Sequence, residues 1–289
     1  MRSNLARQDD LLPSTRPEKL AYSRRNPENQ WRFDRMKSFL SYLGGKSLLA
    51  GKIIPLMPKH TCYCEVFAGA AWMLFKKAES DVEIINDINT DLVTLYRVVK
   101  HHLEAFIQYL KWILIARDEY HRFMIEEPEA LTDIQRAVRF YYLLRNSYGA
   151  KVTGQTFNIN TTRPSGFNLL RLEEELSDIH LRLFRVYIEN RPYSKVIERY
   201  DKPHTFFYID PPYYGCEKDY GEGIFSREDF GRLRNQLDGI DGKFIMSIND
   251  VPEIKTIFKG YKIDVVGTKY IIKGANKAKK VNELLIRNF

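Results

Sequence analysis

The chain has 289 residues of ordinary globular composition, 44% hydrophobic and 28% charged, with a formal net charge of +8. This length accommodates one large α/β domain with a substantial insertion, or two small domains. The sequence contains no run of about 18 apolar residues, and its first residues lack the apolar stretch of a secretory signal. Three cysteines without metal-like spacing argue against a disulfide framework or a zinc site. We therefore expect a cytoplasmic protein that binds no metal and does not enter a membrane.

Basic residues gather in two stretches that contain no acid. Six arginines or lysines lie between Ile134 and Leu172, and five lysines lie between Val265 and Asn282. Tyr, Phe and Asn are interleaved with them. This composition suits a surface that faces phosphates, and it also suits a pair of solvated loops.

The first third of the chain alternates predicted strands and helices. Residues 1–36 are polar and proline-punctuated, and we expect a poorly ordered extension. A helix is predicted over Ser47–Met57, a strand over Cys62–Val66 with a helix to Ala78, and a strand over Val82–Ile85 with a helix to about His102. This rhythm indicates a parallel, doubly wound sheet with helices on both faces.

The middle of the chain breaks this rhythm. Residues 103–147 have continuous helical spacing, interrupted near Glu127-Pro128, and 148–168 are rich in Gly, Asn, Thr and Pro, as in a long loop or hairpin. Strands and helices then return. Strands are predicted at Arg185–Ile188, Thr205–Ile209, Lys243–Ile248 and Tyr261–Val266, helices near 192–199, 226–237 and 252–258, and an antiparallel edge at Tyr270–Lys273 and Glu283–Phe289. We infer a catalytic α/β domain over 37–102 and 185–289, with an inserted lobe over 103–184.

The strongest chemical motif is Asp210-Pro211-Pro212-Tyr213, which directly follows the apolar run 205–209. Ligands bind beyond the carboxyl ends of parallel strands. Two successive prolines make a rigid turn. That turn would orient the Asp210 carboxylate and leave the Pro211 carbonyl as an acceptor, with the flat ring of Tyr213 beside them. A merely structural Pro-Pro turn is the alternative.

Methyl transfer to an adenine amino group needs such a set of groups. The lone pair of the amino nitrogen is delocalised into the ring, so the amine is a poor nucleophile. Two acceptors that hold its hydrogens out of the ring plane would localise that lone pair toward the methyl donor. An aromatic face would hold the base after it has left the helix.

Two companion motifs support a cofactor site. The segment 65–71, Glu-Val-Phe-Ala-Gly-Ala-Ala, ends the first strand with small residues that let a cofactor approach the backbone. Asp87 ends the second strand, 18 residues after Gly69 in the sequence. An acid about 20 residues after such a glycine turn commonly bonds ribose hydroxyls. A helix N-cap is the alternative role for Asp87.

With these motifs, the sequence resembles the Dam-like (D12 class, α-group) N6-adenine-specific DNA methyltransferases. The resemblance runs from about Phe39 to the C-terminus and opens with Tyr42-Leu43-Gly44-Gly45-Lys46, similar to an aromatic-x-Gly-Gly-Lys motif. Asp210 to Tyr213 matches the family's catalytic tetrapeptide. The Ser-Ile-Asn-Asp segment 247–250 and the end of the chain, through Glu283-Leu284-Leu285, resemble later family signatures.

The resemblance implies a Rossmann-like S-adenosylmethionine-dependent methyltransferase sheet with an inserted helical DNA-recognition lobe. It implies S-adenosylmethionine as cofactor, double-stranded DNA as partner, and a monomer or weak dimer. The catalytic residues would be Asp210, Pro211, Pro212 and Tyr213, and the cofactor-binding residues Tyr42, Lys46, Phe67, Gly69, Asp87 and Asp210. The candidate DNA-binding residues are Arg145, Asn146, Tyr148 and Lys151, which lie where a predicted helix runs into a glycine-rich loop.

The sequence departs from the family at three places, of which the first is Tyr42, where relatives often have tryptophan. Ala70-Ala71 stand where a second glycine usually follows, and the region around 144–158 matches the family's DNA-reading segment only loosely. A GATC target is therefore not transferable. Methylation of cytosine N4, RNA adenine or a protein amide stays an alternative, as does a decayed relative that only holds DNA. The intact catalytic tetrapeptide and Lys46 argue against the decayed relative.

Overall fold

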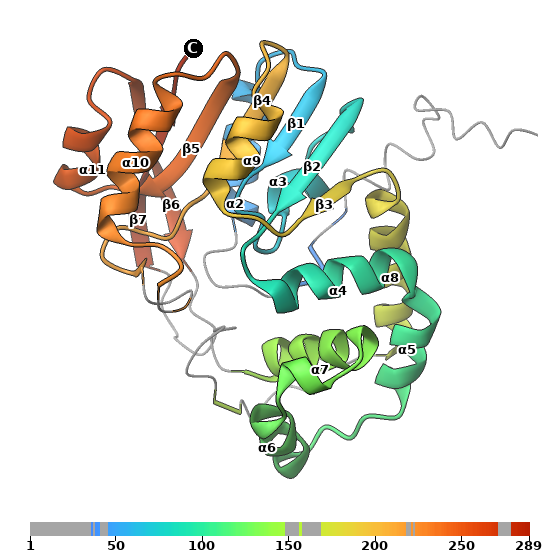
Figure 1. The fold of residues 1–289 in the computed structure, drawn as a ribbon. Coiled ribbons are helices and arrows are strands. Elements are labelled where there is room, and N and C mark those ends of the chain that lie inside the picture. Colours follow the sequence, from blue (N-terminus) through green and yellow to red (C-terminus); the bar gives the residue numbers. More distant parts are fainter. Residues whose placement is uncertain are drawn as a thin grey trace, which may run out of the picture.

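The computed structural model describes residues 36, 38–40, 46–147, 156–157, 169–217, 221, 223–270 and 279–289. A twisted sheet stands beside a helical lobe (Figure 1). The sheet is built from β1 (Cys62–Glu65), β2 (Val82–Asn86), β3 (Tyr187–Glu189), β4 (Thr205–Ile209), β5 (Lys243–Asn249), β6 (Lys262–Tyr270) and β7 (Lys279–Arg287).

The seven strands have the order β3-β2-β1-β4-β5-β7-β6. The first five in this order are parallel, and β7 is antiparallel to both β5 and β6. The predicted parallel sheet with an antiparallel edge is therefore confirmed. The hairpin of β6 and β7 is longer than expected, and Ile271–Lys273, expected as strand, lie outside the described residues.

Helices cover both faces of the sheet because its strands are apolar on both sides. Successive residues of β4 point to opposite faces. Phe206 and Tyr208 pack into one hydrophobic core, and Phe207 and Ile209 pack into the other. The first face is covered by α2 (Ser47–Ile53) with the 3-10 turn η1 (Ile54–Leu56), α3 (Trp72–Lys76) and α4 (Thr90–His101), and the second by α9 (Tyr193–Tyr200), α10 (Arg227–Leu237) and α11 (Pro252–Ile257).

The lobe consists of α5 (Leu103–Lys111), α6 (Arg117–Ile125), the 3-10 turn η2 (Pro128–Ala130), α7 (Asp133–Asn146) and α8 (Leu169–Leu183). The prediction of continuous helix over 103–147 is wrong at 112–116, where an extended segment joins α5 to α6. The hydroxyl of Tyr142 donates to the carbonyl of Leu114 at 2.9 Å, so a distant side chain satisfies the backbone that leaves the helix. The sequence analysis assigned no element to the residues of α8, which follow the predicted loop or hairpin at 148–168.

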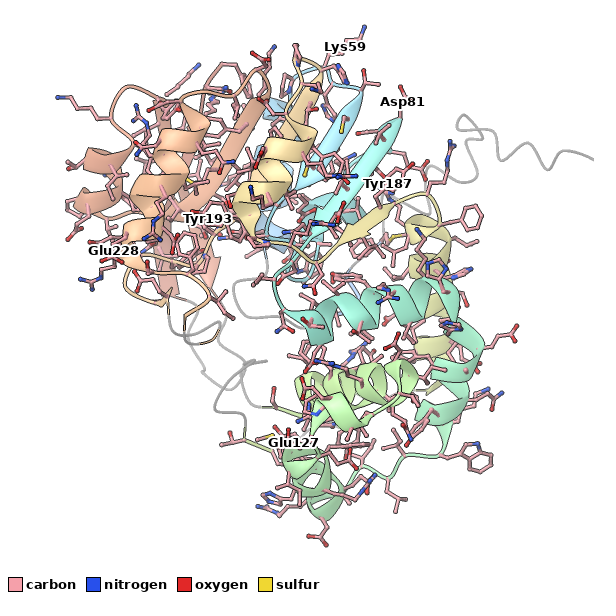
Figure 2. All side chains as sticks on the ribbon, viewed as in Figure 1. Lys59, Asp81, Glu127, Tyr187, Tyr193 and Glu228 are labelled. Atoms are coloured by element: carbon pink, nitrogen blue, oxygen red, sulfur yellow. The ribbon has the colours of Figure 1, made fainter. Side chains whose placement is uncertain are left out.

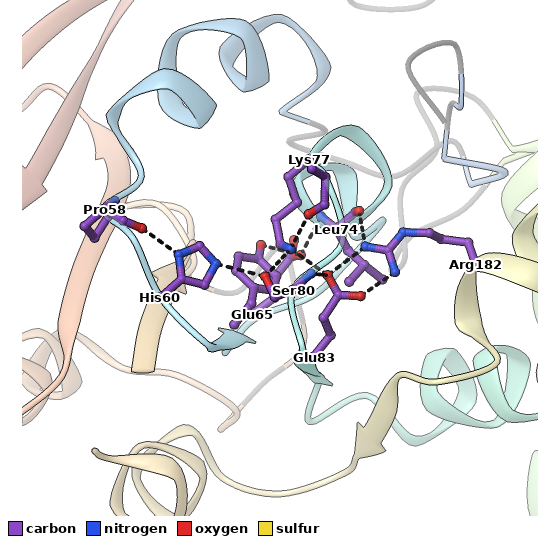
Figure 3. A network of polar contacts seen from close by, with 10 residues as sticks. Pro58, His60, Glu65, Leu74, Lys77, Ser80, Glu83 and Arg182 are labelled. Atoms are coloured by element: carbon purple, nitrogen blue, oxygen red, sulfur yellow. Dashed lines mark hydrogen bonds and ion pairs between the residues drawn. The ribbon is translucent and has the colours of Figure 1, made fainter. Parts of the chain in front are cut away.

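A buried ionic network connects α8 to the sheet (Figure 3). The guanidinium of Arg182 binds both carboxylate oxygens of Glu83 on β2 and donates to the carbonyl of Leu74 at 2.9 Å. The ammonium of Lys77 contacts the same carboxylate at 2.5 Å. Two cations thus share one buried carboxylate at the junction of lobe and sheet.

The lobe lies beyond the carboxyl ends of the parallel strands. Lys59 and Asp81, which precede β1 and β2, lie at the opposite end of the molecule from Glu127 of the lobe (Figure 2). The loops that follow β1, β2 and β4 therefore open toward the lobe. Within the described ranges no helix is long and apolar enough to cross a membrane.

Candidate active site

One cavity lies where the strand order reverses, between β1 and β4. From β1 the chain continues to β2 on one side, and from β4 it continues to β5 on the other side. Such a reversal leaves a crevice for a ligand outside the carboxyl ends of β1 and β4. The space between its walls is about 700 Å³, part of which is open solvent. Its lining includes Lys46, Glu65, Phe67, Gly69, Asp87, Ile88, Asp210, Pro212 and Phe225.

The turn after β1 has a left-handed backbone at two positions. Gly69 has φ of 48° and Ala71 has φ of 50°. The hydroxyl of Tyr96 donates to the Gly69 carbonyl at 2.8 Å and fixes the turn from α4. Gly69 adopts the left-handed conformation freely because it has no side chain. Ala71 adopts it at a steric cost, because its Cβ approaches the backbone.

Asp87 joins the turn after β1 to the loop after β2. Its carboxylate accepts from the backbone N–H of Gly69 and of Asn89, each at 2.9 Å. Burial raises the pKa of Asp87, and these two donors oppose the rise. The cap of α4 is Asn89, whose side chain accepts from Leu92 at 3.1 Å, so Asp87 is not the helix cap that the alternative required.

Apolar side chains flank this end of the cavity. The ring of Phe67 stacks on Tyr193 with centroids 5.6 Å apart and meets Phe225 edge-on at 5.9 Å. Ile88 lies in the loop between Asp87 and Asn89, with 40% of its surface exposed. Phe67 was predicted for this site. Ile88 could have been found as the middle residue of the acidic loop, whereas Phe225 lies in no motif.

Asp210 lies at the other end of the same cavity, directly after β4. One of its oxygens is 3.2 Å from the Lys46 ammonium and accepts from the Ser247 hydroxyl at 3.3 Å. The side chain is 20% exposed. Burial raises the pKa of Asp210 to about 6, with Lys46 opposing the rise and Glu283 adding to it. The group therefore titrates close to neutral pH.

The rest of the tetrapeptide continues the wall of the cavity. Pro211 and Pro212 are buried, and Pro212 lines the cavity. Asn249 holds the following loop by two hydrogen bonds to the backbone of Tyr214, each 3.0 Å long. The Ser-Asn resemblance in 247–250 thus corresponds to two side chains that fix the loop from β5.

Lys46 was predicted to contact the methyl donor. It lines the cavity and also contacts Tyr213 of the tetrapeptide. Its ammonium is 4.3 Å from the centre of the Tyr213 ring and donates to the Tyr213 hydroxyl. Glu283 of β7 binds both groups, a role that sequence reasoning missed because β7 is far along the chain. Tyr42, the other predicted residue of that motif, lies outside the described residues.

Glu65 is a second carboxyl group that the sequence pattern did not single out. It ends β1, is 2% exposed, and accepts from the Tyr63 hydroxyl at 2.9 Å and the Leu74 N–H at 3.1 Å. Burial raises the pKa of Glu65 to about 8. This part of the cavity therefore holds a carboxyl group that binds its proton more tightly than an exposed glutamate does.

The described candidates for DNA contact form bonds within the lobe. Arg145 donates to the Tyr141 hydroxyl at 2.9 Å and lies 3.6 Å from the Glu175 carboxylate. Asn146 is 7% exposed and donates to the carbonyl of Tyr142 at 2.9 Å. Their contact with bases stays a prediction, and it would require these bonds to be exchanged. Tyr148 and Lys151 lie outside the described residues.

Two other arginines of the acid-free stretch share one acid that is distant in the sequence. Arg136 contacts Asp91 of α4 at 2.5 Å, and Arg139 lies 3.8 Å from the same carboxylate. The surplus charge of α7 in the sequence is thus partly balanced in the folded chain. Among described residues no cluster of three or more His, Cys, Asp or Glu is arranged to hold a metal.

This sheet order, with a small-residue turn after β1 and an acid after β2 at one cavity, defines a Rossmann-like methyltransferase domain. A family model described as D12 class N6 adenine-specific DNA methyltransferase matches residues 42–272. The chain belongs to this family. The predicted fold class and the predicted activity, methylation of adenine N6 in DNA, are confirmed.

Several curated relatives carry names that agree with this family. The Type II methyltransferase M.MjaIII of Methanocaldococcus jannaschii is 26% identical, covering 88% of this chain and 99% of its own length. The DNA adenine methylase of Escherichia coli K12 is 26% identical over 86% of this chain and 94% of its own. The Type II methyltransferase M.CviBI of Paramecium bursaria Chlorella virus NC1A is 24% identical over 78% and 88%.

Proposed function

We propose that the chain uses S-adenosylmethionine as methyl donor and acts on an adenine flipped out of duplex DNA. The observation that carries this proposal is that a donor-type turn and the Asp210 carboxylate line one cavity. A donor held at the β1 and β2 loops and a base held at the β4 loop would meet inside it. When bound, S-adenosylmethionine supplies an activated methyl group on a sulfonium.

The donor end of the cavity fits such a molecule. Asp87 already accepts two backbone hydrogen bonds, and a carboxylate has roughly four lone-pair sites, so it can also accept from ribose hydroxyls. Phe67, Ile88 and Phe225 offer apolar surface for the donor's base. Gly69 presents backbone without a side chain.

The target end would bind the adenine amino group. We propose that Asp210 and the Pro211 carbonyl accept its two hydrogens, so that the nitrogen lone pair points toward the donor. The Tyr213 ring would stack on the base. Preorganised acceptors of this kind need no metal and no thiol nucleophile.

The protein is proposed to act as a monomer or a weak dimer. We propose that the helical lobe is the site of DNA recognition. Arg145 and Asn146 are the last two residues of α7, and Tyr148 and Lys151 follow them in the sequence. Arginine and asparagine match guanine and adenine edges in the major groove. Cytoplasmic location stays a prediction from the sequence.

The test is transfer from isotopically labelled S-adenosylmethionine to duplex DNA, single-stranded DNA and RNA in parallel, followed by identification of the modified base. We expect N6-methyladenine in duplex DNA only, with unchanged rates in a metal chelator. Label in cytosine, in RNA or in the protein itself would favour another amine as substrate. A matched reaction with Asp210→Ala gives the background.

A further inference from the structure

Glu283 is a buried carboxylate at the target end of the cavity that lies outside the catalytic tetrapeptide. It is on β7, opposite Asn249 in the antiparallel pairing of β7 with β5. Because β7 is antiparallel to β5, this pairing places Glu283 at the carboxyl end of β5, beside the Asn249 side chain that bonds the backbone of Tyr214. Its side chain is 1% exposed.

The two oxygens of this carboxylate have different partners. One accepts a hydrogen bond from the Tyr213 hydroxyl at 2.6 Å, and the other accepts from the Lys46 ammonium at 3.1 Å. The Tyr213 hydroxyl also accepts from Lys46. Three side chains from three separate parts of the sequence thus form a closed set of hydrogen bonds.

Lys46 shares its charge between two carboxylates. An ammonium has three N–H donors, and Lys46 has three acceptors around it: Glu283, the Tyr213 hydroxyl, and Asp210 at 3.2 Å. Its residue is 4% exposed, so water contributes little to balancing the charge. Without Glu283, Asp210 would be the remaining carboxylate among these partners.

We propose that Glu283 is a positioning residue for methyl transfer, which anchors the Tyr213 ring and keeps Lys46 from pairing with Asp210 alone. The inference rests on the proposed roles of Asp210 and Tyr213. A carboxylate that is fully engaged by an ammonium is a weaker acceptor for an incoming amino group. A ring without its hydroxyl anchor is less fixed for stacking.

The charge of Glu283 also acts on the ionisation of Asp210. The groups that face Asp210 are Lys46 before α2, Ser247 on β5, Glu283 on β7, Tyr208 on β4 and Glu65 on β1. Glu283 raises the pKa of Asp210, and Lys46 lowers it. Removing the charge of Glu283 removes the first effect and strengthens the second, so the pKa of Asp210 should fall.

The experiment compares Glu283→Gln with Glu253→Gln, the same chemical change at an exposed position of α11. Tyr213 and Lys46 bind different oxygens of Glu283, and glutamine has an NH₂ donor in place of one of these oxygens, so it cannot keep both contacts in the same geometry. Rates are measured in single-turnover reactions with duplex DNA across a pH series. Donor affinity is measured separately by calorimetry.

We expect Glu283→Gln to lower the single-turnover rate about 10- to 100-fold, the size of effect known for residues that orient the ligands of a catalytic metal. The acid limb of its pH profile should move to lower pH, and donor affinity should change little. Glu253→Gln should match the wild type. A merely structural loss would lower the amount of active enzyme without moving the pH limb.

A folded Glu283→Gln enzyme with the wild-type rate and pH limb would overturn the proposal. If that variant does not fold, Tyr213→Phe decides, because it removes the hydroxyl anchor and keeps the ring. Its rate should lie between those of the wild type and Tyr213→Ala, and a wild-type rate would contradict the anchoring. Full activity of Asp210→Ala would instead refute the proposed function itself.

Discussion

The carboxylate of Asp87 accepts a hydrogen bond from the backbone N–H of Gly69 at 2.9 Å, across 18 residues of sequence. The two loops that we assign to the methyl donor are therefore joined to each other in the protein itself. The acid fixes the small-residue turn as well as offering its remaining lone pairs to a ligand. Replacing Asp87 would consequently disturb both loops.

Asp210→Ala should abolish methyl transfer and leave donor binding at least partly intact. Loss of a preorganised electrostatic contact to the reacting group commonly costs about 10²-fold or more in rate. Asp210→Asn should also be severely impaired, since an amide is a weaker acceptor and carries a competing donor. Single-turnover rates together with calorimetric donor affinity test this. Near-normal turnover of Asp210→Ala would remove this residue from the mechanism.

Activity should fall as the pH is lowered through about 6. Burial raises the pKa of Asp210 to about 6, and the proposed mechanism uses its ionised form as acceptor. Protonation on the acid side replaces one acceptor by a donor, so the rate is lost below this pKa and retained above it. Single-turnover rates between pH 4.5 and 8, chosen to span roughly 1.5–2 units on each side of that pKa, measure the midpoint. A flat profile through pH 6 would contradict the assignment.

Ala71→Gly should stabilise the protein or leave its stability unchanged. The left-handed backbone at Ala71, with φ of 50°, costs an L-residue about 1–2 kcal/mol, and glycine offsets part of the gain by about 0.5–1 kcal/mol of chain entropy. We expect the free energy of unfolding to rise by up to about 1 kcal/mol. Chemical denaturation measures it, with Ala137→Gly in the buried face of α7 as a control that should destabilise. If both variants lowered the free energy of unfolding equally, the backbone at Ala71 would not be strained.

Glu83→Gln should destabilise the fold by about 3–5 kcal/mol, because it leaves the buried cations of Lys77 and Arg182 without their shared carboxylate. Burial alone would raise the pKa of Glu83, but the two cations outweigh it and lower the pKa. The stabilisation is therefore present above the unfolded pKa and lost as the pH falls through the lower, folded pKa. Denaturation at pH 7, with exposed Glu79→Gln as control, tests this. If the free energy of unfolding fell by less than about 1 kcal/mol, the charge of Glu83 would not be needed to hold Lys77 and Arg182.

Arg145→Ala should distinguish a DNA-reading residue from a structural one. If Arg145 leaves Tyr141 and Glu175 to meet a base, the variant should relax site preference by about 1–3 kcal/mol at one base pair. Methylation profiles across random DNA measure this preference. Arg122→Ala, on the exposed side of α6, is the matched control. Unchanged preference with lower stability would assign Arg145 to lobe packing.

Short-range patterns predicted the parts of the site that lie within single loops. The tetrapeptide at 210–213, the Gly69 turn and Asp87 each follow a strand, and strand ends meet because the sheet is parallel. Glu283 and Phe225 could not be placed in this way, because their contacts depend on how β7 packs beside β5 and on the loop after β4. The pairing of Arg136 with Asp91 likewise joins residues that local charge counts treat separately.

The lobe helices were predicted less well than the sheet. Periodicity in 103–147 stays helical through 112–116, where the backbone leaves the helix and the Tyr142 hydroxyl donates to the carbonyl of Leu114. Tertiary bonding overrides local preference in such segments. The helix α8 follows 148–168, where turn residues dominate and the pattern offers no start signal.

The core of the sheet continues into the lobe without a boundary. Phe39 packs against Tyr96 of α4 at 5.8 Å and against Tyr141 of α7 at 6.0 Å, and Arg182 of α8 binds Glu83 of β2. We therefore expect an exchange of helical lobes between relatives to fail if the lobe were cut at the ends of the insertion. A working chimera would have to carry α4, α7 and α8 together with the residues of β2 and α3 that receive them. With the lobe as our proposed site of DNA recognition, we expect a new target sequence to arise more easily by substitutions in the lobe than by transplanting it.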